Sequence, residues 1–142
     1  MSGPKPLATC WIQRHDLSVA LDDVPVQTVD QVMHHYDGFD WAIEHALFRD
    51  GDARGAEVCP PGLGLVRESD REILHLMPNG RGRMNVSIPG LPQKRRWFHL
   101  FQAFGNMVEV SDVSDTLVRP AITNFLRGHD AALVSAMQGA TS

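Results

Sequence analysis

The stretch Gly64–Ile88, GLVRESDREILHLMPNGRGRMNVSI, decides the fold class of this 142-residue chain. It contains three short apolar runs, Gly64–Glu68, Glu72–Met77 and Arg83–Ile88, whose lengths are typical of β-strands. The last two are joined through Asn79-Gly80, a dipeptide that favours a tight hairpin because both residues tolerate positive φ. The sequence therefore predicts an antiparallel three-stranded meander.

The residues before the meander predict one further strand and a helical region. Leu7–Gln13 is typical of a short strand, and residues 17–26, which carry two aspartates and a proline, are expected to form a connection. Thr28 can cap a helix over Val29–Phe48. Asp37-Gly38 interrupts this helix, so one kinked helix and two separate helices both stay open. The apolar stripe expected to face the core comprises Val29, Val32, Met33, Tyr36, Ile43 and Leu47.

The residues after the meander predict three more helices and one strand. In chain order these are a helix over Arg95–Phe104, a strand over Met107–Val110, a helix ending at Leu126 and a helix over Ala131–Met137. The whole chain is thus expected to be a single α+β domain, residues 1–142. Its mainly antiparallel sheet would hold the meander plus additional strands, with helices packed on one face.

Composition and termini favour a soluble intracellular protein. Apolar residues make up 43% of the chain and charged residues 21%, which is ordinary for a globular domain. No apolar run approaches the roughly 20 residues that span a bilayer, and the N-terminus lacks the apolar core of a secretory signal. We therefore expect a cytoplasmic protein without membrane contact, with flexible ends at residues 1–6 and 139–142.

The two cysteines, Cys10 and Cys59, do not form a disulfide framework. In a reducing compartment the simplest interpretation is two partly buried small apolar side chains, although a single bridge stays open.

Charge is unevenly distributed along the chain. Ile73–Val108 contains five Lys or Arg residues and no Asp or Glu, whereas the rest carries eight basic residues against seventeen acidic ones. Basic residues at the start of a helix oppose its dipole, so an anion bound there would be favourable. The sequence predicts a surface for an acidic partner or another anion, made of Arg81, Arg83, Lys94, Arg95, Arg96 and Trp97.

A second candidate site is the cluster of histidines and carboxylates on the predicted first helical region. Imidazole and carboxylate groups three or four residues apart share a helix face, and both ligate transition metals. The possible ligands are His34, His35, Asp37, Asp40 and His45, with Glu44 beside them. A solvated acidic helix face accounts for the same residues.

These features favour a non-enzymatic interaction module over an enzyme. The sequence contains no nucleophile elbow and no phosphate-binding glycine motif, and it predicts no cofactor. We expect an acidic protein partner or anionic ligand on the basic-aromatic surface, and self-association into a homo-oligomer, most simply a dimer. Two alternatives stay open: a small enzyme or metal- or ligand-binding protein that uses the histidine cluster, and a nucleic-acid accessory protein. The net charge of −4 does not favour the last.

Overall fold

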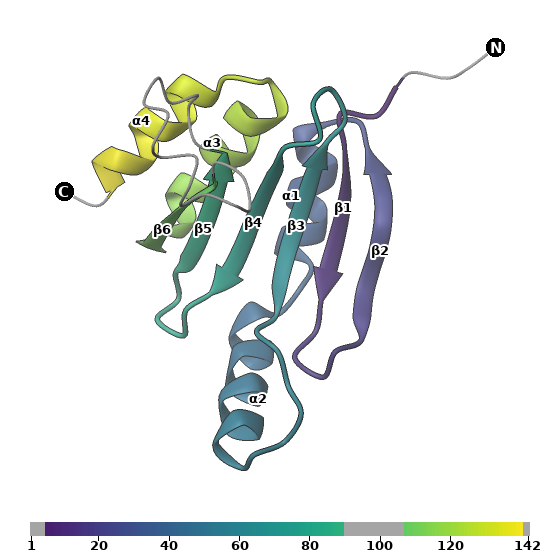
Figure 1. Cartoon of the computed structure of the whole chain (residues 1–142), viewed down its shortest axis with the longest axis vertical. Coiled ribbons are helices and arrows are strands. Elements are labelled where there is room, and N and C mark those ends of the chain that lie inside the picture. Colours follow the sequence, from purple (N-terminus) through teal and green to yellow (C-terminus); the bar gives the residue numbers. More distant parts are fainter. Residues whose placement is uncertain (1–4, 90–106, 141–142) are drawn as a thin grey trace, which may run out of the picture.

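The computed structural model describes residues 5–89 and 107–140, which form a six-stranded antiparallel sheet and four helices (Figure 1). The strands are β1 (Ala8–Gln13), β2 (Val19–Val26), β3 (Gly62–Arg67), β4 (Ile73–Pro78), β5 (Met84–Pro89) and β6 (Met107–Val113). The helices are α1 (Val29–Asp37), α2 (Trp41–Ala53), α3 (Asp115–Leu126) and α4 (Asp130–Ala140). The strand order is β2-β1-β3-β4-β5-β6, with helices packed against the sheet. The prediction of an α+β fold is confirmed.

The predicted meander is strands β3, β4 and β5, each paired antiparallel with the next. The prediction for residues 17–26 is wrong, because this segment forms β2 at the edge of the sheet. An edge strand bonds to a neighbour on one side only, so it tolerates Pro25 and the exposed Asp22 and Asp23. Its composition therefore lacks the apolar alternation of a strand with neighbours on both sides.

The predicted first helix is two helices. Thr28 caps α1 in a capping box with Gln31, as the sequence indicates. Gly38 then ends α1, and the Asp40 carboxylate accepts a hydrogen bond from the Ile43 backbone N–H at 3.0 Å, which starts α2. Figure 1 shows α2 extending beyond the lower end of the sheet. At the other end of the chain, α4 runs through Gly139, and the predicted helix over residues 95–104 lies outside the described residues.

One face of the sheet forms the hydrophobic core. Alternate residues of the strands, including Leu65, Leu74 and Val86, are fully buried there and form one cluster with the apolar side chains of α3, such as Phe125. Cys10 belongs to this cluster, and burial raises the pKa of its thiol to about 12. Cys10 and the half-buried Cys59 are both free thiols, so the interpretation of unpaired cysteines is confirmed.

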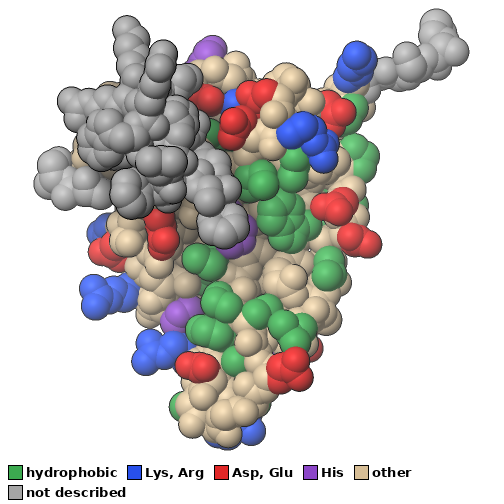
Figure 2. Space-filling view, viewed as in Figure 1, with side chains coloured by type: hydrophobic (Ala, Val, Ile, Leu, Met, Phe, Trp, Pro, Cys, Tyr) green, Lys and Arg blue, Asp and Glu red, His purple; other side chains and the backbone are tan. Residues whose placement is uncertain are grey.

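The opposite face of the sheet carries a row of residues that are adjacent across the strands. In register they are Trp11, Gly64, His75, Ser87 and Glu109. The Trp11 indole lies flat over Gly64 and stacks on the His75 ring, with 6.0 Å between ring centroids. Figure 2 views the molecule from this side and shows apolar side chains among the strands rather than a continuous charged surface.

Candidate binding surface

The predicted basic-aromatic surface is only partly within the described residues. Arg81 and Arg83 lie in the hairpin between β4 and β5, and both are exposed. A guanidinium N–H of Arg83 donates to the Asp112 carbonyl oxygen at 3.2 Å. The other four residues of the prediction, Lys94, Arg95, Arg96 and Trp97, lie outside the described residues, so their part in such a surface stays a prediction.

A pocket of about 370 Å³ opens beside this hairpin. Its walls come from the end of α1, the first half of α2, the hairpin and the start of α3. The lining is mostly apolar, with one arginine and one carboxylate: Tyr36, Trp41, Ala42, His45, Ala46, Pro78, Gly80, Gly82, Arg83, Met84 and Asp115. Pockets of this size and character are typical of ligand or side-chain binding sites.

The hairpin wall of the pocket depends on glycine. Gly80 and Gly82 have φ of +83° and +74°, a region that side chains with a Cβ rarely adopt. Gly80 also lies against His45, because a Cβ added there would be 2.5 Å from the imidazole Cε1. The Asn79 side chain fixes the hairpin to β6 by donating to an Asp112 carboxylate oxygen at 2.7 Å. Glycine therefore allows the backbone to approach α2 closely enough to form one side of the pocket.

The opposite wall is aromatic and its polar atoms are paired. The Trp41 indole N–H donates to the Tyr36 carbonyl oxygen at 2.9 Å, and the Tyr36 hydroxyl donates to Asp115 at 2.8 Å. Burial, together with the Asp115 carboxylate, raises the pKa of Tyr36, so the phenol stays protonated and remains a donor. Phe39 packs on Trp41 with ring centroids 4.5 Å apart. The polar atoms of this wall therefore have defined hydrogen-bond partners within the protein.

His45 contributes a neutral ring to the pocket. Burial, and to a smaller extent the nearby charge of Arg49, lower the pKa of this imidazole. A neutral imidazole can donate or accept one hydrogen bond at each nitrogen, so His45 acts at neutral pH as a polar group rather than as a cation.

The structure separates the predicted metal ligands. His34 and His35 are on α1 beside a different hollow, which Asp30 and β2 also line, whereas His45 is on α2 in the pocket. Asp40 is engaged as the cap of α2. Within residues 5–89 and 107–140, no group of three or more His, Cys, Asp or Glu side chains is arranged to hold a metal ion. The break at Gly38 causes the separation, because it removes the common helix on which the spacing argument depends.

The outward face of α2 is a feature that the sequence prediction placed incorrectly. Ile43 and Leu47, expected in the core stripe, are 58% and 44% exposed, and the neighbouring Ala42 and Ala46 are exposed as well. The face turned toward the protein instead carries Glu44. Gly38 ends α1 and Asp40 starts α2, so the inward face of α2 is rotated relative to that of α1. These two residues were the sequence signals that Ile43 and Leu47 would face outward.

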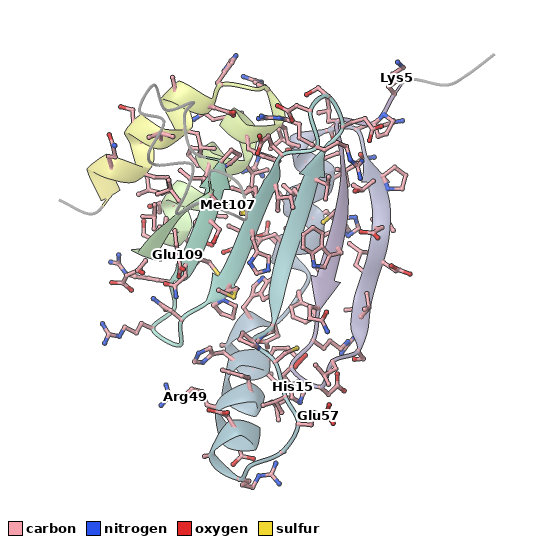
Figure 3. All side chains as sticks on the ribbon, viewed as in Figure 1. Lys5, His15, Arg49, Glu57, Met107 and Glu109 are labelled. Carbon is pink, nitrogen blue, oxygen red and sulfur yellow. The ribbon has the colours of Figure 1, made fainter. Side chains whose placement is uncertain are left out.

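Glu44 joins α2 to the turn between β1 and β2. One of its carboxylate oxygens lies 2.7 Å from Nδ1 of His15, while the other, Oε1, is buried without a hydrogen-bond partner among the described residues. Figure 3 shows His15 on one side of α2 and Arg49 on the other. The β4–β5 hairpin lies on the same side as Arg49 in this view. The His15–Glu44 contact therefore lies on the side of α2 away from the hairpin and the pocket.

In comparisons with protein-family models, curated proteins and solved structures, no match to this chain was found. Among the described residues, no helix has the length and apolar character that a membrane span requires.

Proposed function

We propose that the protein is a small interaction module that binds an acidic segment of a partner protein. The binding site is the hairpin–α2 surface, which we define as Gly80–Arg83 of the hairpin with Trp41, Ala42, His45 and Ala46 of α2. The observation that carries the proposal is the apolar pocket with Arg83 in its lining. An apolar side chain of the partner would enter the pocket, and a carboxylate would lie beside the arginine.

The charges around the pocket support an anionic ligand. Arg49 and Arg81 are exposed, and neither takes part in an ion pair with the described residues. The carboxylates near the pocket include Asp115, which accepts from Tyr36, Asp112, which accepts from Asn79, and Asp37, whose charge contributes to the raised pKa of Tyr36. Asp115 and Asp112 are thus engaged by hydrogen bonds within the protein, whereas the guanidinium groups of Arg49 and Arg81 form no ion pair with the described residues. Together with Arg83 in the lining, these guanidinium groups favour an acidic partner over a basic one.

The dye 8-anilinonaphthalene-1-sulfonate tests this surface directly, because it combines an aromatic body with a single sulfonate. We expect it to bind with fluorescence enhancement that weakens as salt is added. Ala46→Trp, which fills the pocket from an exposed position of α2, should abolish binding. Arg83→Glu should weaken it by about tenfold, on the scale of one charge-assisted contact.

Two matched controls separate a local effect from net charge. Lys5→Glu and Arg127→Glu make the same change of charge at exposed positions that do not line the pocket. They should leave dye binding unchanged while thermal melts verify that all variants are folded. Equal affinity of Ala46→Trp and the unmodified protein for the dye would refute the site. Strong retention of duplex DNA at low salt, lost in Arg81→Glu with Arg83→Glu, would instead support the nucleic-acid alternative.

A further inference from the structure

The α2 helix presents two parallel rows of apolar residues to solvent. Ile43 and Leu47 form one row and Ala42 and Ala46 the other, each pair one helical turn apart. The helix contacts β4 on its inner side, and no other described helix packs on these rows. The apolar rows continue into the pocket, since Ala42 and Ala46 also line it.

This surface has the form that helices use to pack against helices. Rows of side chains four residues apart make ridges, and the small alanine row beside the larger Ile43–Leu47 row makes a groove. Small side chains allow another backbone to approach closely. The 13 residues of α2 correspond to a length of roughly 20 Å, enough for three to four turns of a second helix.

The charges at the margins of these rows determine which helix would fit. Arg49 lies in the second half of α2, and Arg81 and Arg83 lie across the pocket on the hairpin. Asp50 continues the Ala42–Ala46 row by one turn, and its carboxylate is paired with the Arg54 guanidinium, 3.1 Å away on the same helix. A helix that packs its apolar side on the rows would therefore place its flanking polar residues beside the three arginines Arg49, Arg81 and Arg83.

We propose that the partner segment is an acidic amphipathic helix, which lies along α2 with its apolar side on Ala42, Ile43, Ala46 and Leu47. One large apolar side chain enters the pocket between Trp41 and the hairpin, and its acidic edge faces the arginines. This inference rests on the proposed function and specifies the conformation of the partner. It corresponds to recognition of a helix in a groove, in which residues at helical spacing provide the anchors.

Three fluorescein-labelled model peptides of about 15 residues, long enough to form a helix on binding, test the proposal. The first has leucines at helical spacing with glutamates between them. The second replaces each glutamate by lysine, and the third keeps the glutamates but carries two central prolines that prevent a helix. By fluorescence anisotropy with the full chain, we expect the glutamate peptide to bind at least about tenfold more tightly than either of the others.

Variants of the protein locate the peptide. Ile43→Ser with Leu47→Ser should weaken binding of the glutamate peptide at least about tenfold, and Arg49→Glu should weaken it about fivefold. The matched controls are Val19→Ser, which changes a side chain that is 50% exposed on β2, and Lys5→Glu. These should bind the peptide like the unmodified chain.

The outcomes distinguish this inference from the proposed function. If dye binding depends on Arg83 but the glutamate peptide binds no more tightly than the lysine peptide, the pocket remains the proposed binding site. The proposal that the partner is an acidic helix is then overturned. Equal binding of the proline peptide would overturn the helical conformation. Sedimentation that shows a dimer, lost in the Ile43→Ser, Leu47→Ser variant, would assign the rows to a second copy of the chain and also overturn the proposal.

Discussion

Replacing Arg67 by methionine should destabilise the protein more than any surface substitution. The side chain is 4% exposed, and all five of its N–H donors are used. Two bonds go to Asp70 at 2.9 and 2.7 Å, two to Asp130 at 2.7 and 3.0 Å, and one to the Phe125 carbonyl oxygen at 2.8 Å. The guanidinium also stacks over the Phe125 ring, 4.7 Å from its centroid. Arg67 thus joins β3 to the end of α3 and the start of α4.

The loss of unfolding free energy in Arg67→Met depends on which of these groups can be rehydrated once the guanidinium is removed. Removing one partner of a buried ion pair costs about 3–5 kcal/mol, because the other charge stays unpaired. Asp130 is 25% exposed and could be rehydrated only in part, whereas Asp70 is 47% exposed and would be rehydrated at a cost of about 1 kcal/mol or less. The Phe125 carbonyl would keep its hydrogen bond from the Gly128 N–H at 3.1 Å. We therefore expect Arg67→Met to lose about 3 kcal/mol, at the lower end of that range, Asp130→Asn roughly 2 kcal/mol, and Asp70→Asn under about 1 kcal/mol.

Urea unfolding followed by circular dichroism measures these differences, with Arg67→Lys as an intermediate that keeps the charge but cannot bridge both carboxylates. A pH series adds a second test. Hydrogen bonds from Arg67 lower the pKa of Asp70 below 3.8, so this contact stabilises the native state above that pH and is lost as pH falls through the folded value. Arg67→Met should remove this acid dependence. A loss below about 1 kcal/mol for Arg67→Met, or equal losses for the two aspartate variants, would refute the reasoning.

Three further predictions concern the open face of the sheet and its turns. Gly64→Ala should lose about 1–3 kcal/mol in urea unfolding and alter the near-ultraviolet dichroism of Trp11, because the new Cβ would overlap the indole. The control Gly139→Ala should not destabilise, because a Cβ added there would meet no described side chain within 4 Å. Leu17→Gly should raise the unfolding free energy by about 1 kcal/mol, since Leu17 has φ of +72° and its side chain is 48% exposed; an unchanged or lower value would contradict a strained turn. Burial lowers the pKa of His75 below 6.5, and the Glu109 charge offsets this shift only in part. The stability that the neutral ring contributes is therefore present above pH 6.5 and is lost as pH falls below it. Thermal melts from pH 7.5 to 5 should show this loss of stability in the unmodified protein, and His75→Gln should reduce it.

Local sequence signals predicted the parts of the fold that depend on neighbouring residues. Thr28 caps α1, and β4 and β5 form the hairpin that Asn79-Gly80 indicates, because both effects need only the backbone nearby. The connection is longer than a turn of these two residues: it spans residues 79–83, with positive φ at Gly80 and Gly82. Strand β2 was missed because its own residues, with two aspartates and a proline, lack the alternation of a half-buried strand. It is stabilised by backbone pairing with β1, the strand that directly precedes it in the chain. Backbone pairing of this kind leaves little trace in the periodicity of side chains.

The candidate site was predictable only in part, for a related reason. The excess of positive charge around Arg81 and Arg83 is visible in the sequence, but the pocket beside them needs α2 to lie against the hairpin. If Val29–Phe48 formed one continuous helix, Ile43 and Leu47 would lie on its buried face. Because a second helix starts after Asp40, both side chains face solvent. The break between Gly38, which ends α1, and Asp40, which caps α2, therefore places these two apolar side chains on the surface rather than in the core.

The contacts that attach α2 to the rest of the protein are consistent with a helix whose exposed face binds a partner. Its inner face carries Glu44, a buried carboxylate. Among the residues that the structure describes, one of its oxygens is paired with His15 and the other has no hydrogen-bond partner, so the lost hydration is only partly replaced. An apolar residue at this position would stabilise the contact more. Such a contact fixes direction, because a 2.7 Å hydrogen bond tolerates less rotation than apolar packing does. The Trp41 bond to the Tyr36 carbonyl adds a second fixed point near the start of the helix. Two directional contacts on the inner side hold Ile43 and Leu47 outward in a defined orientation, which reduces the ordering cost when a partner binds.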